Sequence, residues 1–341
     1  MNKVDKKLLV FHHVDLDGYG VKAISRIYGF LKGYEEDQMV FIEADYYGYN
    51  LCDTKINKYL KGKEDEFAEI IFGDISVCYE ATAEYLNALS KRIPIILRDH
   101  HDTALWINKY NWAKVREEDD NGIKRCGTFW IAEELLTKEY VASHPNLKEF
   151  IYLVDMFDTW KWASENPQVT QAKDLSLIMS EIGMNDFDEY IYNKLLCEEE
   201  VDLIDERMEF LLKYINKTIK KEFLSANSNK KFMTYTYVKD NISIPLKFVI
   251  INASSHGFTI AQKISESLKK AKIYYDAIFI YSFKGGLSIK CDDKCKVPAN
   301  ELIKFFAIKG GGHLGAAGGS VDTERIDKAY EIIFEGAKVL K

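Results

Sequence analysis

The chain has 341 residues, of which 47% are hydrophobic and 29% are charged, with only 20 glycines and 5 prolines. This composition excludes a disordered or collagen-like protein and suffices for roughly two globular domains. The net charge of −7 argues against nonspecific binding to duplex nucleic acid, so any nucleic-acid substrate is expected to be short. The apolar runs have strand length and the basic N-terminus lacks an adequate apolar stretch behind it, so we expect a cytoplasmic protein without a membrane segment.

The six cysteines are scattered rather than paired in the spacing of a disulfide framework or a zinc ribbon. Cys291 and Cys295 are the only close pair in the sequence, and neither a second pair nor a histidine is nearby. We therefore interpret all six as reduced thiols rather than as zinc ligands.

From Lys7 to about Phe157, short β-branched runs alternate with longer helical patterns, which is typical of a parallel sheet with crossover helices. The expected strands are Leu8–Phe11, Met39–Glu43, Ile70–Phe72 and Ile93–Leu97. Three of them run directly into polar residues, and ligands bind beyond the carboxyl ends of the strands in an open α/β sheet. We therefore expect these polar residues to converge on one crevice.

The second half of the chain begins with a helical pattern from about Asn166 to Ser225, and the turn-rich segment Ser225–Lys231 is expected to end it. A second alternation follows, with strands near Phe232–Val238, Lys247–Ile251, Ala277–Phe283 and Gly286–Cys291 and helices over Thr259–Lys269, over Pro298–Phe306 and after Gly319. The predicted fold class is α/β. We expect a parallel-sheet domain over 1–190, a helical linker over 191–228 and a smaller mixed-sheet domain over 229–341.

His13, Asp15 and Asp17 alternate along the segment that follows the first expected strand. In an extended chain all three side chains would point the same way. Imidazole and carboxylate groups suit a divalent cation, and two such carboxylates can reach two ions about 3.5–4 Å apart. Taken alone, the motif has an alternative interpretation, in which both aspartates cap the helix that begins near Gly18 and the histidine is incidental.

Asp99, His100 and His101 follow the most apolar expected strand, and Asp74 follows another. Burying adjacent histidines and acids at strand ends without a metal would leave charges uncompensated. Together with the first motif, they indicate a metal centre rather than a solvated loop. No serine or cysteine sits beside the strand-end histidines, so no covalent intermediate is expected.

These segments resemble the motifs of the DHH phosphoesterases. The family motifs are matched by His13-Val-Asp15-Leu-Asp17-Gly18, by Asp74, by Asp99-His100-His101 and, in the DHH-associated (DHHA1) domain, by Gly310-Gly-Gly-His313 followed by Ala316-Ala-Gly318. The resemblance spans residues 8 to 320. Its details, including Asp158-Thr-Trp-Lys-Trp162, look most like the oligoribonuclease (nano-RNase) branch of the family.

The resemblance implies two manganese ions, for which Mg²⁺ or Co²⁺ are possible substitutes, with Asp74 bridging them. The implied ligands are His13 and Asp15 for one ion, Asp17, His100 and a fourth-motif aspartate for the other, and Asp74 for both. The fourth-motif aspartate is Asp158 by its sequence context, with Asp155, one helical turn away, as the alternative or as an outer contact. Asp99 would orient a histidine, and His101 would face the substrate phosphate as a donor or general acid.

In the second domain, the glycine run would bring backbone amides close to a phosphate, with a histidine as a further donor. Lys290 occupies a strand on which related enzymes place a basic side chain, and as a lysine it would act as a point charge. Asn252 begins another strand-to-helix turn, for which an ordinary helix cap is the alternative. The implied substrate-binding residues are Lys290, Gly311, Gly312, His313, Ser288 and Asn252.

The resemblance implies hydrolysis of short RNA oligonucleotides (nanoRNA) to mononucleotides by a water that two metal ions activate. Linear or cyclic dinucleotides and 3′-phosphoadenosine 5′-phosphate are alternative substrates. From a different class, the alternative is a nucleotide-binding sensor that has lost catalysis, which the complete ligand set disfavours. The expected partners are short single-stranded RNA or dinucleotides, and neither duplex DNA nor a membrane, with a homodimer as the alternative to a monomer.

Overall fold

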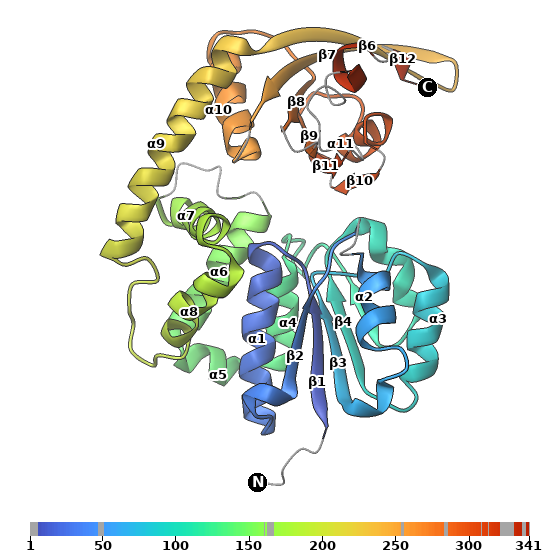
Figure 1. Cartoon of the computed structure of the whole chain (residues 1–341), viewed down its shortest axis with the longest axis vertical. Coiled ribbons are helices and arrows are strands. Elements are labelled where there is room, and N and C mark those ends of the chain that lie inside the picture. Colours follow the sequence, from blue (N-terminus) through green and yellow to red (C-terminus); the bar gives the residue numbers. More distant parts are fainter. Residues whose placement is uncertain are drawn as a thin grey trace. The chain divides into compact units, whose positions relative to one another are not determined.

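The computed structural model describes residues 6–46, 51–159, 161, 167–253, 256–282, 286–307, 309–312, 314–320, 331–335 and 339–340. The chain divides into two compact units, Met1–Leu212 and Lys213–Lys341, whose elements are labelled in Figure 1. Among the described residues, no helix combines the length and the apolar character that crossing a bilayer requires. The domain boundaries expected from the sequence stay a prediction.

The first unit is built on a five-stranded sheet in the order β2-β1-β3-β4-β5, and all of its strand pairs are parallel. The strands are β1 (Lys7–His12), β2 (Met39–Glu43), β3 (Phe67–Gly73), β4 (Ile95–Asp99) and β5 (Ala113–Val115). The predicted parallel α/β class is confirmed. The fourth strand runs two residues further than expected, so that Asp99 ends the strand instead of following it.

Helices cover both faces of this sheet (Figure 1). Helices α1 (Leu16–Lys32) and α4 (Gly127–Leu135) pack together on one face, while α2 (Cys52–Tyr59) and α3 (Glu80–Leu89) lie on the other. On the second face, Phe11 and Phe72 stack with ring centroids 4.7 Å apart in a core completed by α2 and α3. The sheet is therefore apolar on both faces, and its polar groups are confined to its ends.

The remaining elements of the first unit follow the sheet or lie between its strands. They are the 3-10 helices η1 (Glu36–Gln38), η3 (Glu64–Glu66) and η4 (Asp102–Lys109) and the α-helices α5 (Lys138–Ser143), α6 (Pro145–Asp158), α7 (Pro167–Ile182) and α8 (Met184–Leu195). Helix α9 (Glu206–Asn229) then runs into the second unit.

The expectation of one helical segment from Asn166 to Ser225 is wrong in two respects. Gly183, with a φ of 83°, separates α7 from α8, and residues 196–205 are not helical. The buried Asn146 holds this interruption, because its amide group donates to the carbonyls of Cys197 (3.1 Å) and Glu199 (2.8 Å). The expected break at Ser225 is also wrong, since α9 continues to Asn229.

The second unit contains a seven-stranded mixed sheet in the order β10-β11-β9-β8-β7-β6-β12. Its strands are β6 (Lys231–Lys239), β7 (Ile242–Asn252), β8 (Ala277–Tyr281), β9 (Gly286–Cys291), β10 (Lys309–Gly312), β11 (Ala316–Ser320) and β12 (Val339–Leu340). The pairs β7–β8 and β6–β12 are parallel and the others antiparallel. Helix α10 (Gly257–Lys270) connects β7 to β8.

One expectation for the second unit needs correction. The expected helix over Pro298–Phe306 is a single turn, α11 (Ala299–Leu302), that tightens into the 3-10 helix η6 (Ile303–Phe305). Part of the glycine-rich segment forms a strand, because Gly310 to Gly312 lie in β10 and pair with β11. Of the helix expected after Gly319, the described residues show only η7 (Glu331–Glu335), a π-helical turn.

The close approach of α1 and α4 yields a stability prediction at Gly20. An added Cβ there would meet the Oγ1 of Thr128 and lie 2.8 Å from its Cγ2, and the Thr128 side chain is held by a 2.7 Å bond to the Asp17 carbonyl. Gly20→Ala should therefore lower the free energy of unfolding by about 1–3 kcal/mol, although alanine is the better helix former. Thermal and urea unfolding measure the change.

Gly29 in the same helix provides the matched control. An added Cβ there would meet the flexible end of Met39, which can move, so Gly29→Ala should cost less than Gly20→Ala. An equal or higher stability of Gly20→Ala relative to the wild type would contradict the packing described for the two helices.

Candidate metal centre

The carboxyl ends of the central strands carry the polar residues singled out in the sequence. His13 to Asp17 follow β1, Asp74 follows β3, and His100 and His101 follow β4. Their ligand atoms form three groups in which all members lie within 4.8 Å of one another. The groups are His13 with Asp15 and Asp74; Asp17 with His100 and Asp158; and Asp74 with Asp99, His100 and His101.

Asp74 belongs to two of these groups and is 1% exposed. Its Oδ2 lies 3.7 Å from His13 Nδ1, and its Oδ1 lies 3.2 Å from His100 Nε2. The chain leaves β3 at Asp74 in the left-handed region, with a φ of 57°, which aspartate and asparagine tolerate better than most residues. Gly127 packs against this turn so closely that a Cβ there would lie 2.5 Å from the Asp74 Cβ.

Asp15 serves both the helix and the cluster. Its Oδ1 accepts a 3.0 Å bond from the Gly18 amide and caps α1, while its Oδ2 lies 2.9 Å from His13 Nδ1. The alternative interpretation, in which the aspartate caps the helix, is therefore correct for Asp15 Oδ1. The expectation that His13, Asp15 and Asp17 alternate along an extended segment is wrong, because α1 begins at Leu16 and Asp17 lies in its first turn.

Asp17 reaches across to the start of α4. Its two oxygens accept 2.7 Å bonds from the amides of Gly127 and Thr128, at the positive end of that helix. Its Oδ2 also lies 3.7 Å from His100 Nε2. The same carboxylate thus fixes the α1–α4 contact and contributes to the cluster.

The two candidates for the fourth-motif aspartate have different surroundings. Asp158 Oδ2 lies 3.4 Å from His100 Nε2 and belongs to one of the three groups. Asp155 belongs to none of them, because its carboxylate accepts 2.9 Å bonds from Arg125 Nη1 and from the Cys126 amide. Asp155 therefore anchors the segment before α4, and the structure places Asp158 with the other candidate ligands.

His101 is held by a polar network that includes two residues the sequence did not point to. Asp99 Oδ1 lies 2.7 Å from His101 Nδ1, and Asp99 Oδ2 accepts bonds from Ser76 Oγ (2.7 Å) and Tyr46 Oη (3.0 Å). Tyr46 Oη is also 3.2 Å from His101 Nδ1. Tyr46 follows β2 and Ser76 follows β3. The rule that ligands bind beyond the carboxyl ends of the strands could therefore have pointed to both residues.

A third missed residue, Asp45, faces the other side of His13. Its Oδ1 lies 3.6 Å from His13 Nε2, whereas His13 Nδ1 faces Asp15 and Asp74. A carboxylate on the second nitrogen of an imidazole is the usual arrangement around a metal-binding histidine, where it orients the ring. Asp45 is thus placed to orient His13.

The electrostatics of the cluster favour a bound cation. Burial, reinforced by the neighbouring Asp17 carboxylate, raises the pKa of Asp74 well above its ordinary value, and burial raises the pKa of Asp158 to about 7. Neither buried oxygen of Asp74, nor Asp158 Oδ2, has a hydrogen-bond partner within the described part of the chain. Oxygens of this kind, beside two imidazoles, are suitable ligands for divalent cations.

The predicted substrate-binding residues of the second unit fall into two places. Lys290 and Ser288 lie on β9 opposite Ala316 and Gly318 of β11, which in turn pairs with the β10 strand that holds Gly311 and Gly312. Burial lowers the pKa of Lys290. Asn252 ends β7, away from these three strands, and His313 lies outside the described residues.

Comparison with known proteins finds two similar curated proteins, although no family model matches the chain. Over 328 residues it is 25% identical to the oligoribonuclease NrnB of Bacillus subtilis strain 168, with 95% of this chain and 74% of NrnB covered. It is 24% identical over 362 residues to a 3′,5′-cyclic-nucleotide phosphodiesterase of Helicobacter pylori, with 96% and 97% covered.

Solved structures share the fold. A DHH domain from the s1p family of ribosomal proteins matches with a TM-score of 0.61 at 14% identity, covering 99% of this chain and 88% of that one. The exonuclease RecJ bound to manganese matches with a TM-score of 0.53 at 13% identity, covering 93% and 86%. The curated relatives, together with the order of the motifs and the fold shared with the solved structures, support a metal-dependent phosphoesterase of the DHH/DHHA1 type that is similar to NrnB.

Proposed function

We propose that this phosphoesterase hydrolyses short single-stranded RNA oligonucleotides to mononucleotides with the help of two divalent cations, manganese by preference. The observation that carries the proposal is the sharing of Asp74 between two groups of ligand atoms at one sheet edge. The likeness to NrnB, a protein named as an oligoribonuclease, supports the substrate class. The likeness to a cyclic-nucleotide phosphodiesterase supports the second candidate, a cyclic or linear dinucleotide.

Two sets of residues would hold the cations. His13, Asp15 and Asp74, which form one of the groups, would bind one ion. Asp17, His100 and Asp158, which form another, would bind the second ion, with Asp74 as its fourth ligand because Asp74 Oδ1 lies 3.2 Å from His100 Nε2. When bound, such ions lower the pKa of a coordinated water and stabilise the charge that develops on a phosphoryl group.

The protein itself supplies orientation and proton transfer. Asp99 fixes the His101 ring through Nδ1, and Ser76 and Tyr46 fix Asp99 in turn. We assign the transfer of a proton to the leaving oxygen to His101 Nε2. We further assign phosphate binding in the second unit to Lys290, Ser288, Gly311, Gly312 and His313.

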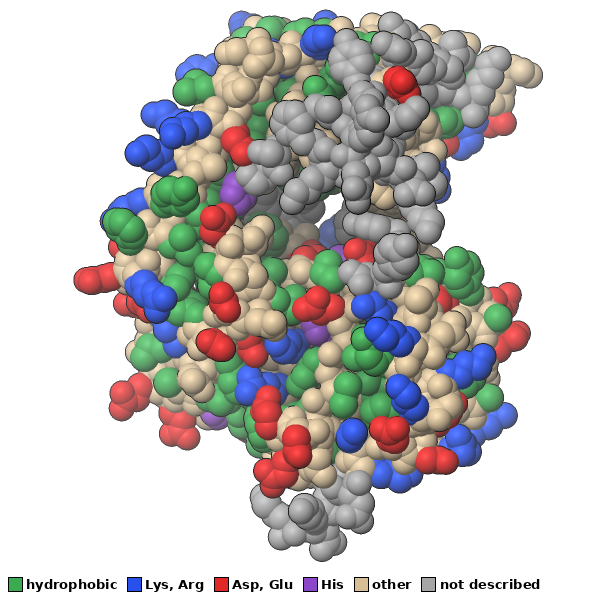
Figure 2. Space-filling view, in the orientation of Figure 1, with side chains coloured by type: hydrophobic (Ala, Val, Ile, Leu, Met, Phe, Trp, Pro, Cys, Tyr) green, Lys and Arg blue, Asp and Glu red, His purple; other side chains and the backbone are tan. Residues whose placement is uncertain are grey.

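The charge of the protein favours short substrates. The net charge is −7, and Figure 2 shows acidic and basic side chains interspersed on the visible face of the first unit. A long nucleic acid gains affinity mainly where many lysines and arginines neutralise its phosphates, so additional nucleotides would gain little here.

Asp74→Asn tests the metal centre, because it should not lower the stability of the metal-free protein but should abolish the stabilisation by metal. Asparagine tolerates the left-handed backbone at this position and removes a buried charge that faces Asp17, so the metal-free variant should be as stable as the wild type or more stable. The rise in melting temperature that MnCl₂ gives the wild type should be lost, together with hydrolysis. Scanning fluorimetry with chelator and with Mn²⁺ measures both effects.

Asp53→Asn is the matched control for this experiment. Asp53 is a buried aspartate of the same unit whose oxygens accept bonds from the amides of Cys78 and Tyr79, outside the three groups. The control should lower stability and keep the Mn²⁺ effect. An Asp74→Asn protein with an undiminished Mn²⁺ shift would refute the shared ligand.

His101→Gln separates proton transfer from metal binding. If His101 acts as a general acid, kcat should fall by about 10²–10⁴-fold while the Mn²⁺-induced stabilisation is kept. Turnover within a few-fold of the wild type would remove His101 from the chemistry, and loss of the Mn²⁺ effect would make it a ligand instead.

Substrate length tests the binding role of the second unit. Oligomers of about two to five nucleotides should be cleaved much faster than oligomers of about twenty, because the acidic surface adds little affinity for the extra phosphates. Lys290→Ala should lower kcat/KM for the short substrates without changing Mn²⁺ binding, whereas Lys294→Ala, in the exposed turn after β9, should not. Rates that stay constant over this range of lengths would favour a longer-substrate exonuclease.

A further inference from the structure

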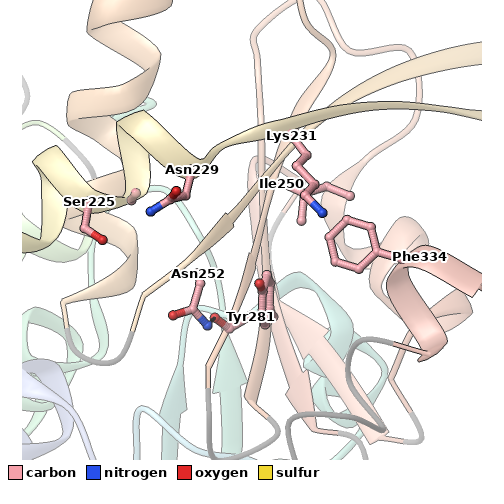
Figure 3. Close-up of a pocket in the computed structure, with 8 residues that line it drawn as sticks. Ser225, Asn229, Lys231, Ile250, Asn252, Tyr281 and Phe334 are labelled. Atoms are coloured by element: carbon pink, nitrogen blue, oxygen red, sulfur yellow. Dashed lines mark hydrogen bonds between the residues drawn. The ribbon is translucent and has the colours of Figure 1, made fainter.

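The second unit contains a cavity of about 380 Å³ that the proposed chemistry does not use (Figure 3). It is lined by Ser225, Ala226, Asn229, Lys231, Ile250, Asn252, Tyr281 and Phe334. These residues come from the end of α9, the start of β6, the ends of β7 and β8, and η7. The volume is in the range of small-molecule sites and is too small for a polymer strand.

The position of the cavity in the sheet is one at which α/β proteins bind ligands. Strands β7 and β8 are parallel neighbours joined by α10, and Asn252 and Tyr281 are their last residues, paired with each other. Ligands of α/β sheets bind outside the carboxyl ends of such strands. Lys290 lies opposite Ile278 and Ser288 lies opposite Ile280, next to Tyr281 on β8, but neither residue lines the cavity.

The walls of the cavity combine one positive charge with aromatic rings. Lys231 is the only charged residue among the described residues that line it, and its Nζ lies 4.7 Å from the centroid of the Phe334 ring. The rings of Phe334 and Tyr281 meet edge to face with centroids 6.3 Å apart. A ring face next to an ammonium group suits a ligand that carries both a planar ring and an anion.

The polar groups of the cavity are amides and a hydroxyl, with no carboxylate among the described lining residues. The Asn252 amide is fixed in orientation, because its Nδ2 donates a 3.1 Å bond to the Tyr281 carbonyl. Asn229 and Ser225 face it from α9, and Ile250 and Phe334 lie toward the other wall (Figure 3). Amides can pair with the edge of a base, and a hydroxyl can pair with a ribose.

We propose that this cavity binds one 5′-mononucleotide unit, with its phosphate at Lys231, its base on Phe334 and its polar edges at Asn252 and Asn229. The choice of a nucleotide rests on the proposed function, since mononucleotides would be the products of that reaction. A free mononucleotide and the terminal nucleotide of an oligomer have the same chemistry, and the experiment below distinguishes them.

The test is calorimetric titration of the full chain with chelator present, so that no hydrolysis occurs. AMP should bind, and Lys231→Gln and Phe334→Leu should each weaken its binding by about tenfold. Lys239→Gln, at the far end of β6 where Lys239 pairs with Glu301 at 3.0 Å, is the control and should bind AMP as the wild type does. Adenosine and inorganic phosphate should each bind more weakly than AMP.

Different outcomes overturn different parts of the inference. AMP binding that is absent, or unchanged in both Lys231→Gln and Phe334→Leu, would overturn the site, and phosphate binding as tight as AMP binding would overturn the nucleotide class. A phosphorothioate dinucleotide that binds more tightly than AMP would identify the ligand as the end of an oligomer, while equal or weaker binding would identify it as the free mononucleotide. Failure of the proposed function itself would show separately, as absent hydrolysis of short RNA with Mn²⁺.

Discussion

The burial of several carboxylates at one edge of the parallel sheet is the constraint on which the first unit depends. Asp17, Asp74 and Asp99 are at most 2% exposed, and removing a carboxylate from water costs several kcal/mol unless it is paired or hydrogen-bonded. Asp99 is compensated by Ser76, Tyr46 and His101, and Asp17 by two amides of α4. Asp74 accepts no hydrogen bond from the described residues and faces only imidazoles, those of His13 and His100 among them, so its charge is the one that a cation would compensate.

This constraint also explains the position of α4. Its first amides bind Asp17, the segment before it is held by Asp155 through Arg125 and Cys126, and Gly127 packs against the turn at Asp74. A side chain at Gly127 would push the helix away from both carboxylates at once. The helix is thus part of the site although it contributes none of the candidate ligands, and the two aspartates near the end of α6 have separate tasks, one structural and one in the cluster.

The sequence predicted the parallel sheet and four of its strands because apolar strands that end in polar residues have a strong local pattern. It did not predict contacts that depend on tertiary packing. Asp17 was expected beside His13 on an extended segment, but the cap at Asp15 starts α1 at Leu16. Sequence context favoured Asp158 over Asp155, and the tertiary contacts distinguish the two: Asp155 binds Arg125, whereas Asp158 lies beside His100. Tyr46 follows a strand and could have been found by that rule, but its partners Asp99 and His101 lie more than 50 positions away, and no local motif identifies them.

The acidity of the protein and the anionic charge of its proposed substrate can be reconciled through the metal centre. A cluster rich in carboxylates repels phosphate by itself, and two divalent cations would reverse that charge where the phosphodiester must bind. Affinity for the substrate would then depend on metal loading, and long-range attraction would contribute little at a net charge of −7. The basic groups assigned to recognition are accordingly few and local: Lys290 on β9, and Lys231 beside Phe334. Such local contacts would hold one or two nucleotides, and this is the physical reason for the proposed preference for short substrates.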